Sequence, residues 1–242
     1  MTAALAFADA GEAADLAAFL ARLIHYDRAA AVRLQAGPVA GSGSEQSLAV
    51  FGRPPSFEVL AIRTARVDSA AGLDVTVSAG ELLEGLDITA GTATVPAAVT
   101  GPPWAGLLPP RGGWRQLPGL PSPDAVRSAV AAVVTEFRTR TEKLPAELRT
   151  RAELDRIGRE IWSRPLGDTD LPVRAAHAAQ SLGFLRPVRV AVPDLGTAAR
   201  HMDQPALLAA GSWLRLRTPY GSVAVRRASD PNGLGGLSVT PA

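Results

Sequence analysis

The sequence predicts an α+β fold: an N-terminal antiparallel sheet with covering helices, a Pro/Gly-rich connector, and a C-terminal helical domain with a β-hairpin. Short alternating apolar runs fill the first half, and twelve of the 23 residues at 101–123 are proline or glycine. Well-capped helical segments begin directly after this stretch. The expected units are an acidic α+β domain at 1–100, the connector at 101–121, a basic helical domain at 122–230 and a flexible tail at 231–242.

The composition is that of a folded protein, with 47% apolar and 20% charged residues in a chain of 242. The absence of cysteine excludes disulfides and thiolate metal sites. No apolar run approaches the roughly 20 residues that a membrane span needs, and the apolar N-terminal stretch lacks the basic start of a signal peptide. We therefore expect a cytoplasmic protein without a membrane contact. The arginine-rich, lysine-poor amino-acid composition indicates a bacterial source.

The first half is expected to form one long helix and several strands. Leu16, Leu20 and Leu23 recur at helical spacing within a helix at about residues 11–24. Apolar runs then predict strands at 29–37, 47–52, 57–67 and 73–79. A short helix capped by Ser78 and a further edge strand at 92–99 complete an antiparallel sheet with one or two covering helices.

The connector contains two tryptophans, Trp104 and Trp114, which a free linker would not need. We expect this segment to lie against one or both domains. The alternative is that Trp104 and Trp114 bind a ligand or a protein partner, so both are candidate partner-binding residues.

Three helices are predicted after the connector. Ser122 can cap the first helix, whose first helical position is Pro123, and Thr150 can cap the second. Asp170 is expected to cap a third helix that ends at Gly183. A strand at about 185–192 and a helical piece at about 197–202 follow.

The charge is distributed unevenly along the chain. Residues 1–110 carry six arginines against eleven acids, a net of −5, whereas residues 111–242 carry 19 basic against 12 acidic groups, a net of +7. Such asymmetry indicates a polyanionic partner for the basic half, or docking of the two halves on each other or in a homodimer.

Residues 211–227, GSWLRLRTPYGSVAVRR, alternate around a TPYG turn and predict a β-hairpin. A four-residue loop pairs Arg217 with Ser222 and Trp213 with Arg226, which leaves one face wholly apolar. The apolar face should pack on the domain. The other face carries Trp213, Arg215, Arg217 and Arg226, and we expect it to face solvent.

An arginine-bearing hairpin near a pair of helices resembles the wing of a winged-helix DNA-binding domain. On this interpretation one face of the third helix contacts base edges through Arg174, His177 and Ser181, while the hairpin contacts phosphates through Arg215, Arg217, Arg226 and Arg227. The spacing departs from the family, because about 28 residues separate that helix from the hairpin. The alternative is an ordinary solvated hairpin face.

No phosphate-binding loop, dinucleotide fingerprint, nucleophile elbow or zinc-protease motif is present. The sequence therefore favours a non-enzymatic regulatory or architectural protein whose basic C-terminal half binds nucleic acid, with DNA as the expected partner. No catalytic residue, metal ligand or cofactor is assigned. The alternatives are an adaptor that binds an acidic protein, and an enzyme with a site at the domain junction near Trp104 and Trp114.

Overall fold

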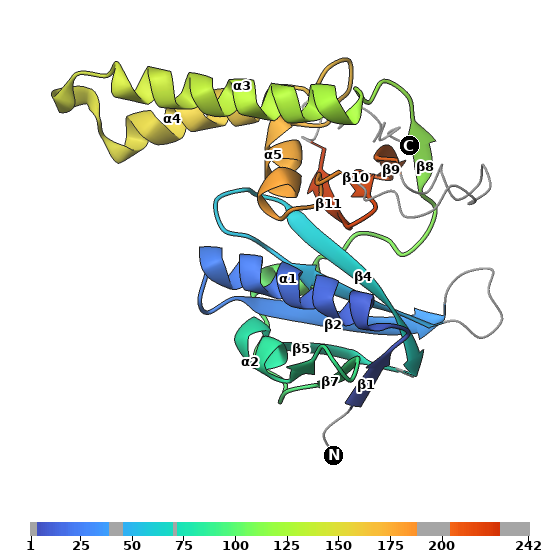
Figure 1. The fold of residues 1–242 in the computed structure, drawn as a ribbon. Coiled ribbons are helices and arrows are strands. Elements are labelled where there is room, and N and C mark those ends of the chain that lie inside the picture. Colours follow the sequence, from blue (N-terminus) through green and yellow to red (C-terminus); the bar gives the residue numbers. More distant parts are fainter. Residues whose placement is uncertain (1–3, 39–45, 70–71, 188–203, 228–242) are drawn as a thin grey trace, which may run out of the picture.

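A computed structural model describes residues 4–38, 46–69, 72–187 and 204–227 (Figure 1). The first half contains β1 (Ala4–Phe7), α1 (Ala10–Tyr26), β2 (Ala31–Pro38), β3 (Gln46–Gly52), β4 (Leu60–Ser69), β5 (Asp74–Ser78), α2 (Ala79–Glu84), β6 (Leu86–Asp87) and β7 (Thr92–Thr94). The second contains two 3₁₀ turns, η1 (Pro103–Gly106) and η2 (Ala146–Leu148), with β8 (Arg115–Leu117), α3 (Pro123–Glu142), α4 (Arg151–Trp162), α5 (Val173–Ser181), β9 (Ala206–Ala210), β10 (Trp213–Thr218) and β11 (Gly221–Arg226).

The strands of both halves belong to one antiparallel sheet. Its main order is β5-β2-β3-β4-β11-β10-β9-β8, and β1, β7 and β6 extend it from β4. The halves join where β11 pairs with β4, with Val223 opposite Ala61. The predicted α+β class is confirmed, and a strand from near the end of the chain lies in the middle of the sheet.

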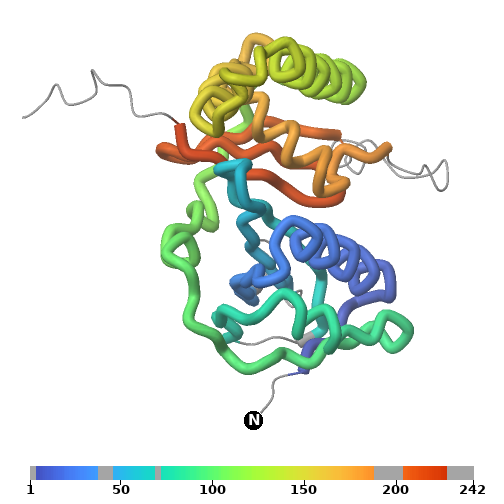
Figure 2. The backbone as a smooth tube through the Cα atoms, turned by 90° about the vertical axis from the view of Figure 1, so that its left-hand side faces the viewer, coloured from blue at the N-terminus to red at the C-terminus, as the bar shows by residue number. Residues whose placement is uncertain are grey.

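One side of the sheet, which we call the helix face, carries the main core. Leu16 and Leu20 of α1 are fully buried with Leu34 and Val50 of the strands beneath them. Further along the same face α5 packs on β11, whose Val223 belongs to the same core. Figure 2 shows α1 and α5 on the same side of the sheet. Spacing of three and four residues in each helix produces this continuous apolar layer.

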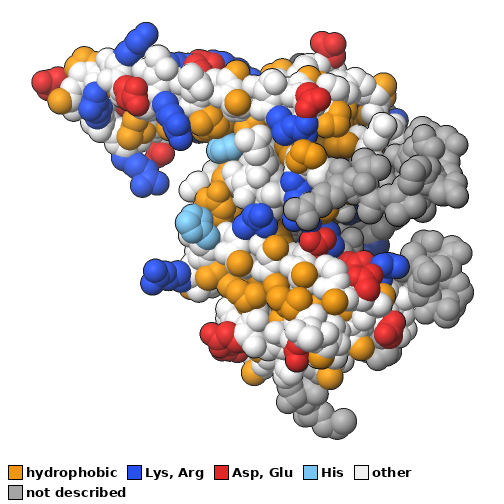
Figure 3. Space-filling view, viewed as in Figure 1, with side chains coloured by type: hydrophobic (Ala, Val, Ile, Leu, Met, Phe, Trp, Pro, Cys, Tyr) orange, Lys and Arg blue, Asp and Glu red, His pale blue; other side chains and the backbone are white. Residues whose placement is uncertain are grey.

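The helices α3 and α4 form an antiparallel pair that projects from the body, and we call this pair the arm (Figure 1). Only Val126 and Val130 of α3 are buried, both near the root of the arm. Further out the two helices are joined by ion pairs, such as the 2.6 Å contact between Arg140 Nη1 and Glu160 Oε1. Lys/Arg and Asp/Glu side chains are interleaved on the visible surface of the arm (Figure 3).

The opposite side of the sheet is the connector face, because residues 101–121 run across it (Figure 2). Trp104 and Leu108 pack there against a small apolar cluster formed by Phe51, Leu60, Ile62 and Ala224. The connector is also hydrogen-bonded to the sheet through the carbonyl oxygen of Ala105, which accepts from Arg33 Nη1 at 3.4 Å. The prediction that this segment lies against the domains is confirmed.

Several local predictions are confirmed and others are wrong. Ser122 and Thr150 cap α3 and α4 through hydrogen bonds from the backbone N–H three residues on, each at 3.3 Å. Asp170 is not a cap, because α5 begins at Val173 and its N-cap is Pro172. The predicted helical piece at 197–202 and most of the strand at 185–192 lie outside the described residues, as does the tail at 231–242.

The strand predicted at 57–67 is shorter at its start than the sequence suggested. Ser56 and Glu58 have positive φ angles, 68° and 52°, so the chain cannot be extended before Leu60. Phe57 lies between them and packs in an aromatic cluster on the helix side of the molecule instead of continuing the strand.

Candidate functional site

The hairpin of β10 and β11 has the register that the sequence predicted. Arg217 pairs with Ser222 and Trp213 with Arg226, so Leu214 and Leu216 face the main core. Alternation along β10 then places Trp213, Arg215 and Arg217 on the connector face.

The hairpin is not a free two-stranded projection. On its outer side β10 pairs with β9, and β11 pairs with β4, so both strands lie in the interior of the sheet. The hairpin therefore does not project as the separate wing that the winged-helix interpretation implies.

Arg215 and Arg217 are half-buried, not fully open to solvent as expected. For Arg215 the connector explains the difference, because the Trp114 ring lies with its centroid 5.6 Å from the Arg215 guanidinium carbon. The Nε atoms of Arg215 and Arg217 are shielded from solvent and make no hydrogen bond within the described part of the chain. Neither guanidinium has a carboxylate within ion-pair distance among those residues.

The electrostatics of this pair are unfavourable in the free protein. Burial lowers the pKa of Arg215 from its ordinary value, and the neighbouring positive charge of Arg217 lowers it further. Both effects disfavour the charged form of the side chain. Two like charges held on one strand face, with no carboxylate in ion-pair distance among the described residues, form a site that favours an anion.

A cavity of about 400 Å³ adjoins Arg215. The N-terminal strands contribute Gln35, Ser47 and Thr64 to its wall, and the connector contributes Arg111. Arg111 has no carboxylate within ion-pair distance in the described ranges, but its positive charge helps to lower the pKa of Asp74. Guanidinium, hydroxyl and amide groups are donors that phosphate oxygens accept.

The remaining hairpin arginines lie at its open end. Arg226 is exposed, and its guanidinium carbon lies 5.3 Å from the Trp213 ring centroid. The backbone N–H of Arg227 donates to the carbonyl oxygen of Ser212, and the Arg227 Nε has no partner among the described residues.

The candidate residues of α5 lie elsewhere. Arg174 reaches Glu58 at 3.9 Å, and His177 lies between the rings of Trp162 and Phe57. Ser181 is half-buried in the last turn of α5. Because α5 covers the helix face, the sheet separates Arg174, His177 and Ser181 from Arg215 and Arg217. His177 and Ser181 therefore do not share a surface with Arg215 and Arg217, whereas Arg174 contacts Glu58, which lines a cavity together with Arg226.

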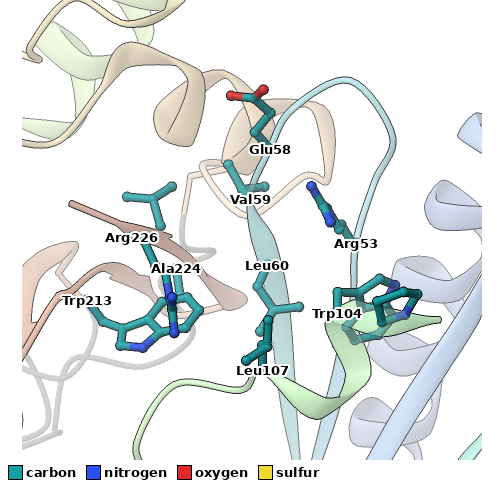
Figure 4. A pocket seen from close by; sticks show the side chains of 11 residues that line it. Arg53, Glu58, Val59, Leu60, Trp104, Leu107, Trp213, Ala224 and Arg226 are labelled. Atoms are coloured by element: carbon teal, nitrogen blue, oxygen red, sulfur yellow. The ribbon is translucent and has the colours of Figure 1, made fainter. Parts of the chain in front are cut away.

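A second cavity, of about 290 Å³, opens where β4, β11 and the connector meet (Figure 4). Trp213 and Arg226 line one side of it, and Trp104 and Arg53 line the other. The sequence indicated Trp104 as a candidate ligand-binding or partner-binding residue but did not indicate Arg53. A single arginine in a loop carries no signal, and only the β4–β11 pairing brings it to the same cavity as Arg226.

Trp114, the other candidate partner residue, is held by its own connector. Its Nε1–H donates to the carbonyl oxygen of Pro110 at 2.9 Å. The ring is therefore oriented over Arg215 by a local hydrogen bond, and it remains half-buried.

Within the ranges given above, no three His, Asp or Glu side chains gather closely enough to hold a metal ion. None of the helices in those ranges is long and apolar enough to cross a membrane.

Family models divide the chain at the connector. A model described as a domain of unknown function, DUF8010, matches residues 1–106, and a second, DUF8185, also a domain of unknown function, matches residues 109–230. No curated protein and no solved structure matches the chain. Both matched regions contribute residues to the two cavities of the connector face. Because its match spans half of the sequence, the DUF8185 model identifies the chain as a member of that family, with a DUF8010 region at its N-terminus.

Proposed function

We propose that the protein is a non-enzymatic, regulatory or architectural protein that binds a single strand of nucleic acid across its connector face. The observation that carries the proposal is the Arg215–Arg217 pair. These guanidinium groups are two residues apart on one strand face and have no carboxylate partner in the described residues.

A phosphate backbone would supply the missing negative charge. Guanidinium groups form paired, charge-assisted hydrogen bonds to phosphate oxygens, which offset the cost of keeping Arg215 and Arg217 partly desolvated. Arg111 beside the larger cavity and Arg226 at the open end of the hairpin extend the positive surface in both directions. The arginines of the arm differ, since Arg140 and Arg164 are neutralised by glutamates.

The tryptophans support a single strand over a duplex. Trp114 and Trp213 lie next to Arg215 and Arg226, and proteins that bind single strands combine a basic surface with aromatic rings on which bases stack. The hairpin is paired on both sides within the sheet and does not project as a separate wing. Arg174, His177 and Ser181 take no part in this binding mode.

Equilibrium binding of a fluorescein-labelled oligo-dT to the full chain tests the proposal. The wild type should bind at low salt, and the double variant Arg215→Ala/Arg217→Ala should bind at least tenfold more weakly, because each charge-assisted contact contributes on the order of 1.5 kcal/mol. The matched control Arg151→Ala/Arg156→Ala removes two arginines from the arm and should bind like the wild type. Equal losses in the two double variants would contradict the proposal.

Competition separates nucleic acid from an acidic protein partner. Unlabelled oligo-dT should displace the probe at far lower charge-equivalent concentration than poly-L-glutamate, because only the oligonucleotide offers bases to Trp114 and Trp213. Equal displacement by poly-L-glutamate would instead favour the adaptor function.

A further inference from the structure

The cavity of about 290 Å³ beside Trp104 and Trp213 has its own chemistry, independent of the Arg215–Arg217 pair. Its base is apolar, formed by Leu60 of β4 and Ala224 of β11 (Figure 4). Two indole rings, from Trp104 and Trp213, flank this base. An apolar cleft with aromatic walls of this size fits one small, flat organic molecule.

A large apolar side chain is left uncovered at this cavity. Leu107 of the connector lines it and is 57% exposed, whereas its neighbour Leu108 packs into the apolar cluster of the connector face. A bound molecule between Leu107 and Leu60 would remove this leucine from water, which is favourable.

The charges around the cavity favour an anion. Arg53 and Arg226 both line it, both are exposed, and neither has a carboxylate partner in the described part of the chain. The single acid in the wall, Glu58, already lies 3.9 Å from Arg174. Among the described residues the lining of the cavity therefore carries two arginines and one glutamate, a net positive charge.

The loop that carries Glu58 is held in a strained conformation. Ser56 and Glu58 are non-glycine residues with φ angles of 68° and 52°, a conformation that costs about 1 kcal/mol or more for each residue. Phe57 lies between them, with its ring centroid 5.1 Å from that of His177 and 5.5 Å from that of Tyr26. This aromatic packing keeps the loop in place. Backbone strain held by packing is typical of ligand sites.

The geometry points to a binding site for a small planar organic acid, with its ring between Trp104 and Trp213 and its carboxylate between Arg53 and Arg226. The ring covers Leu107, Leu60 and Ala224. The carboxylate accepts hydrogen bonds from the two guanidinium groups. Residues of both family regions contribute, so the ligand binds across their junction.

Calorimetric titration of the full chain with 2-naphthoate, and with its neutral analogue 2-naphthalenemethanol, tests this site. The acid should bind, and the alcohol should bind about tenfold more weakly because it cannot form the charged contacts. Arg53→Ala and Leu107→Ala should each weaken naphthoate binding, by about tenfold and by several-fold respectively. Both side chains are exposed, so neither substitution threatens the fold.

Trp213 and Arg226 belong to both proposed surfaces, so two controls at other positions distinguish this site from the Arg215–Arg217 pair. Arg217→Ala removes a charge from β10 outside the cavity and should leave naphthoate binding unchanged, and Arg159→Ala does the same on the arm. Absence of naphthoate binding, equal binding of acid and alcohol, or an equal loss in Arg53→Ala and Arg217→Ala would each overturn the proposal. Oligo-dT binding is measured on the same variants, so the two proposals succeed or fail separately.

Discussion

The imidazole of His177 stacks on the indole of Trp162, with ring centroids 4.5 Å apart and ring planes 9° from parallel. The ring centroid of Phe137 lies 5.9 Å from that of the same indole, and the ring centroid of Phe57 lies 5.1 Å from that of the imidazole. This aromatic stack connects the arm, α5 and the strained loop before β4. A residue that sequence analysis assigned to base contacts thus holds together three segments of the fold.

The first prediction concerns pH. Burial lowers the pKa of His177 below its ordinary value of 6.5, so the unfolded chain binds the proton more tightly than the folded one. Stability should therefore fall as the pH decreases from about 7.5 to about 5.5. The variant His177→Phe keeps the stack without a titrating group, and its melting temperature should fall less over this interval. Identical pH dependence in the wild type and His177→Phe would contradict the prediction.

The second prediction concerns the buried cation of the helix face. Arg63 is only 6% exposed, and its Nη2 contacts Asp15 at 3.0 Å and Glu12 at 3.3 Å. Its removal leaves partly buried carboxylates without this partner, so Arg63→Ala should lower the free energy of unfolding in urea by about 3 kcal/mol.

The matched control is Arg151→Ala, whose side chain is 90% exposed and pairs with Asp155. It should change the free energy of unfolding by no more than about 0.5 kcal/mol. Similar losses of unfolding free energy in Arg63→Ala and Arg151→Ala would show that the buried ion pairs of Arg63 stabilise the fold no more than an exposed ion pair does.

The third prediction concerns Gly221 at the start of β11. A Cβ atom there would lie 2.6 Å from the ring of Phe184, which is buried, and the φ angle of 151° disfavours a side chain as well. Gly221→Ala should therefore destabilise the protein by about 2 kcal/mol. Gly106→Ala, where nothing lies within 4 Å, is the control. Phe184→Leu should lower the free energy of unfolding by less in the Gly221→Ala variant than in the wild type, because the smaller side chain relieves the clash. If the two substitutions lower the free energy of unfolding additively, the steric explanation is wrong.

The fourth prediction concerns the arm. A hydrogen bond from Arg140 lowers the pKa of Glu160 to about 2, with a further contribution from Arg164. The ion pairs of Glu160 therefore contribute fully to stability above pH 4.5, the ordinary pKa of a glutamate. This contribution is lost as the pH falls through about 2. In a carboxyl NMR titration, Arg140→Ala should move the Glu160 midpoint upwards, and Arg151→Ala should not. An unchanged midpoint in Arg140→Ala would contradict the prediction.

Local patterns allowed much of the fold to be predicted. The alternation in residues 211–227 was enough for the hairpin register, because a three-residue loop would place Arg217 opposite Val223 and mix the polar and apolar faces. The caps Ser78, Ser122 and Thr150 were also recognisable, since each side chain accepts a hydrogen bond from a backbone N–H three residues on.

Long-range pairing could not be predicted in this way. Nothing in the alternation of β11 identifies β4 as its neighbour, about 160 residues earlier in the chain. That pairing separates α5 from the arginines of β10 and brings Arg53 to the cavity of Arg226. Of the seven predicted contact residues, Arg215, Arg217 and Arg226 share the connector face. The sequence pointed to Trp104 but not to Arg53 as a residue of the cavity.

The most direct test of the nucleic-acid proposal is the salt dependence of oligo-dT binding. Each lost phosphate contact should reduce the slope of log affinity against log salt by about 0.7 for a single strand. We expect this reduction in Arg217→Ala, a larger one in Arg215→Ala/Arg217→Ala, and the wild-type slope in Arg151→Ala/Arg156→Ala. A wild-type slope in the Arg215→Ala/Arg217→Ala variant would mean that these guanidinium groups do not contact phosphate.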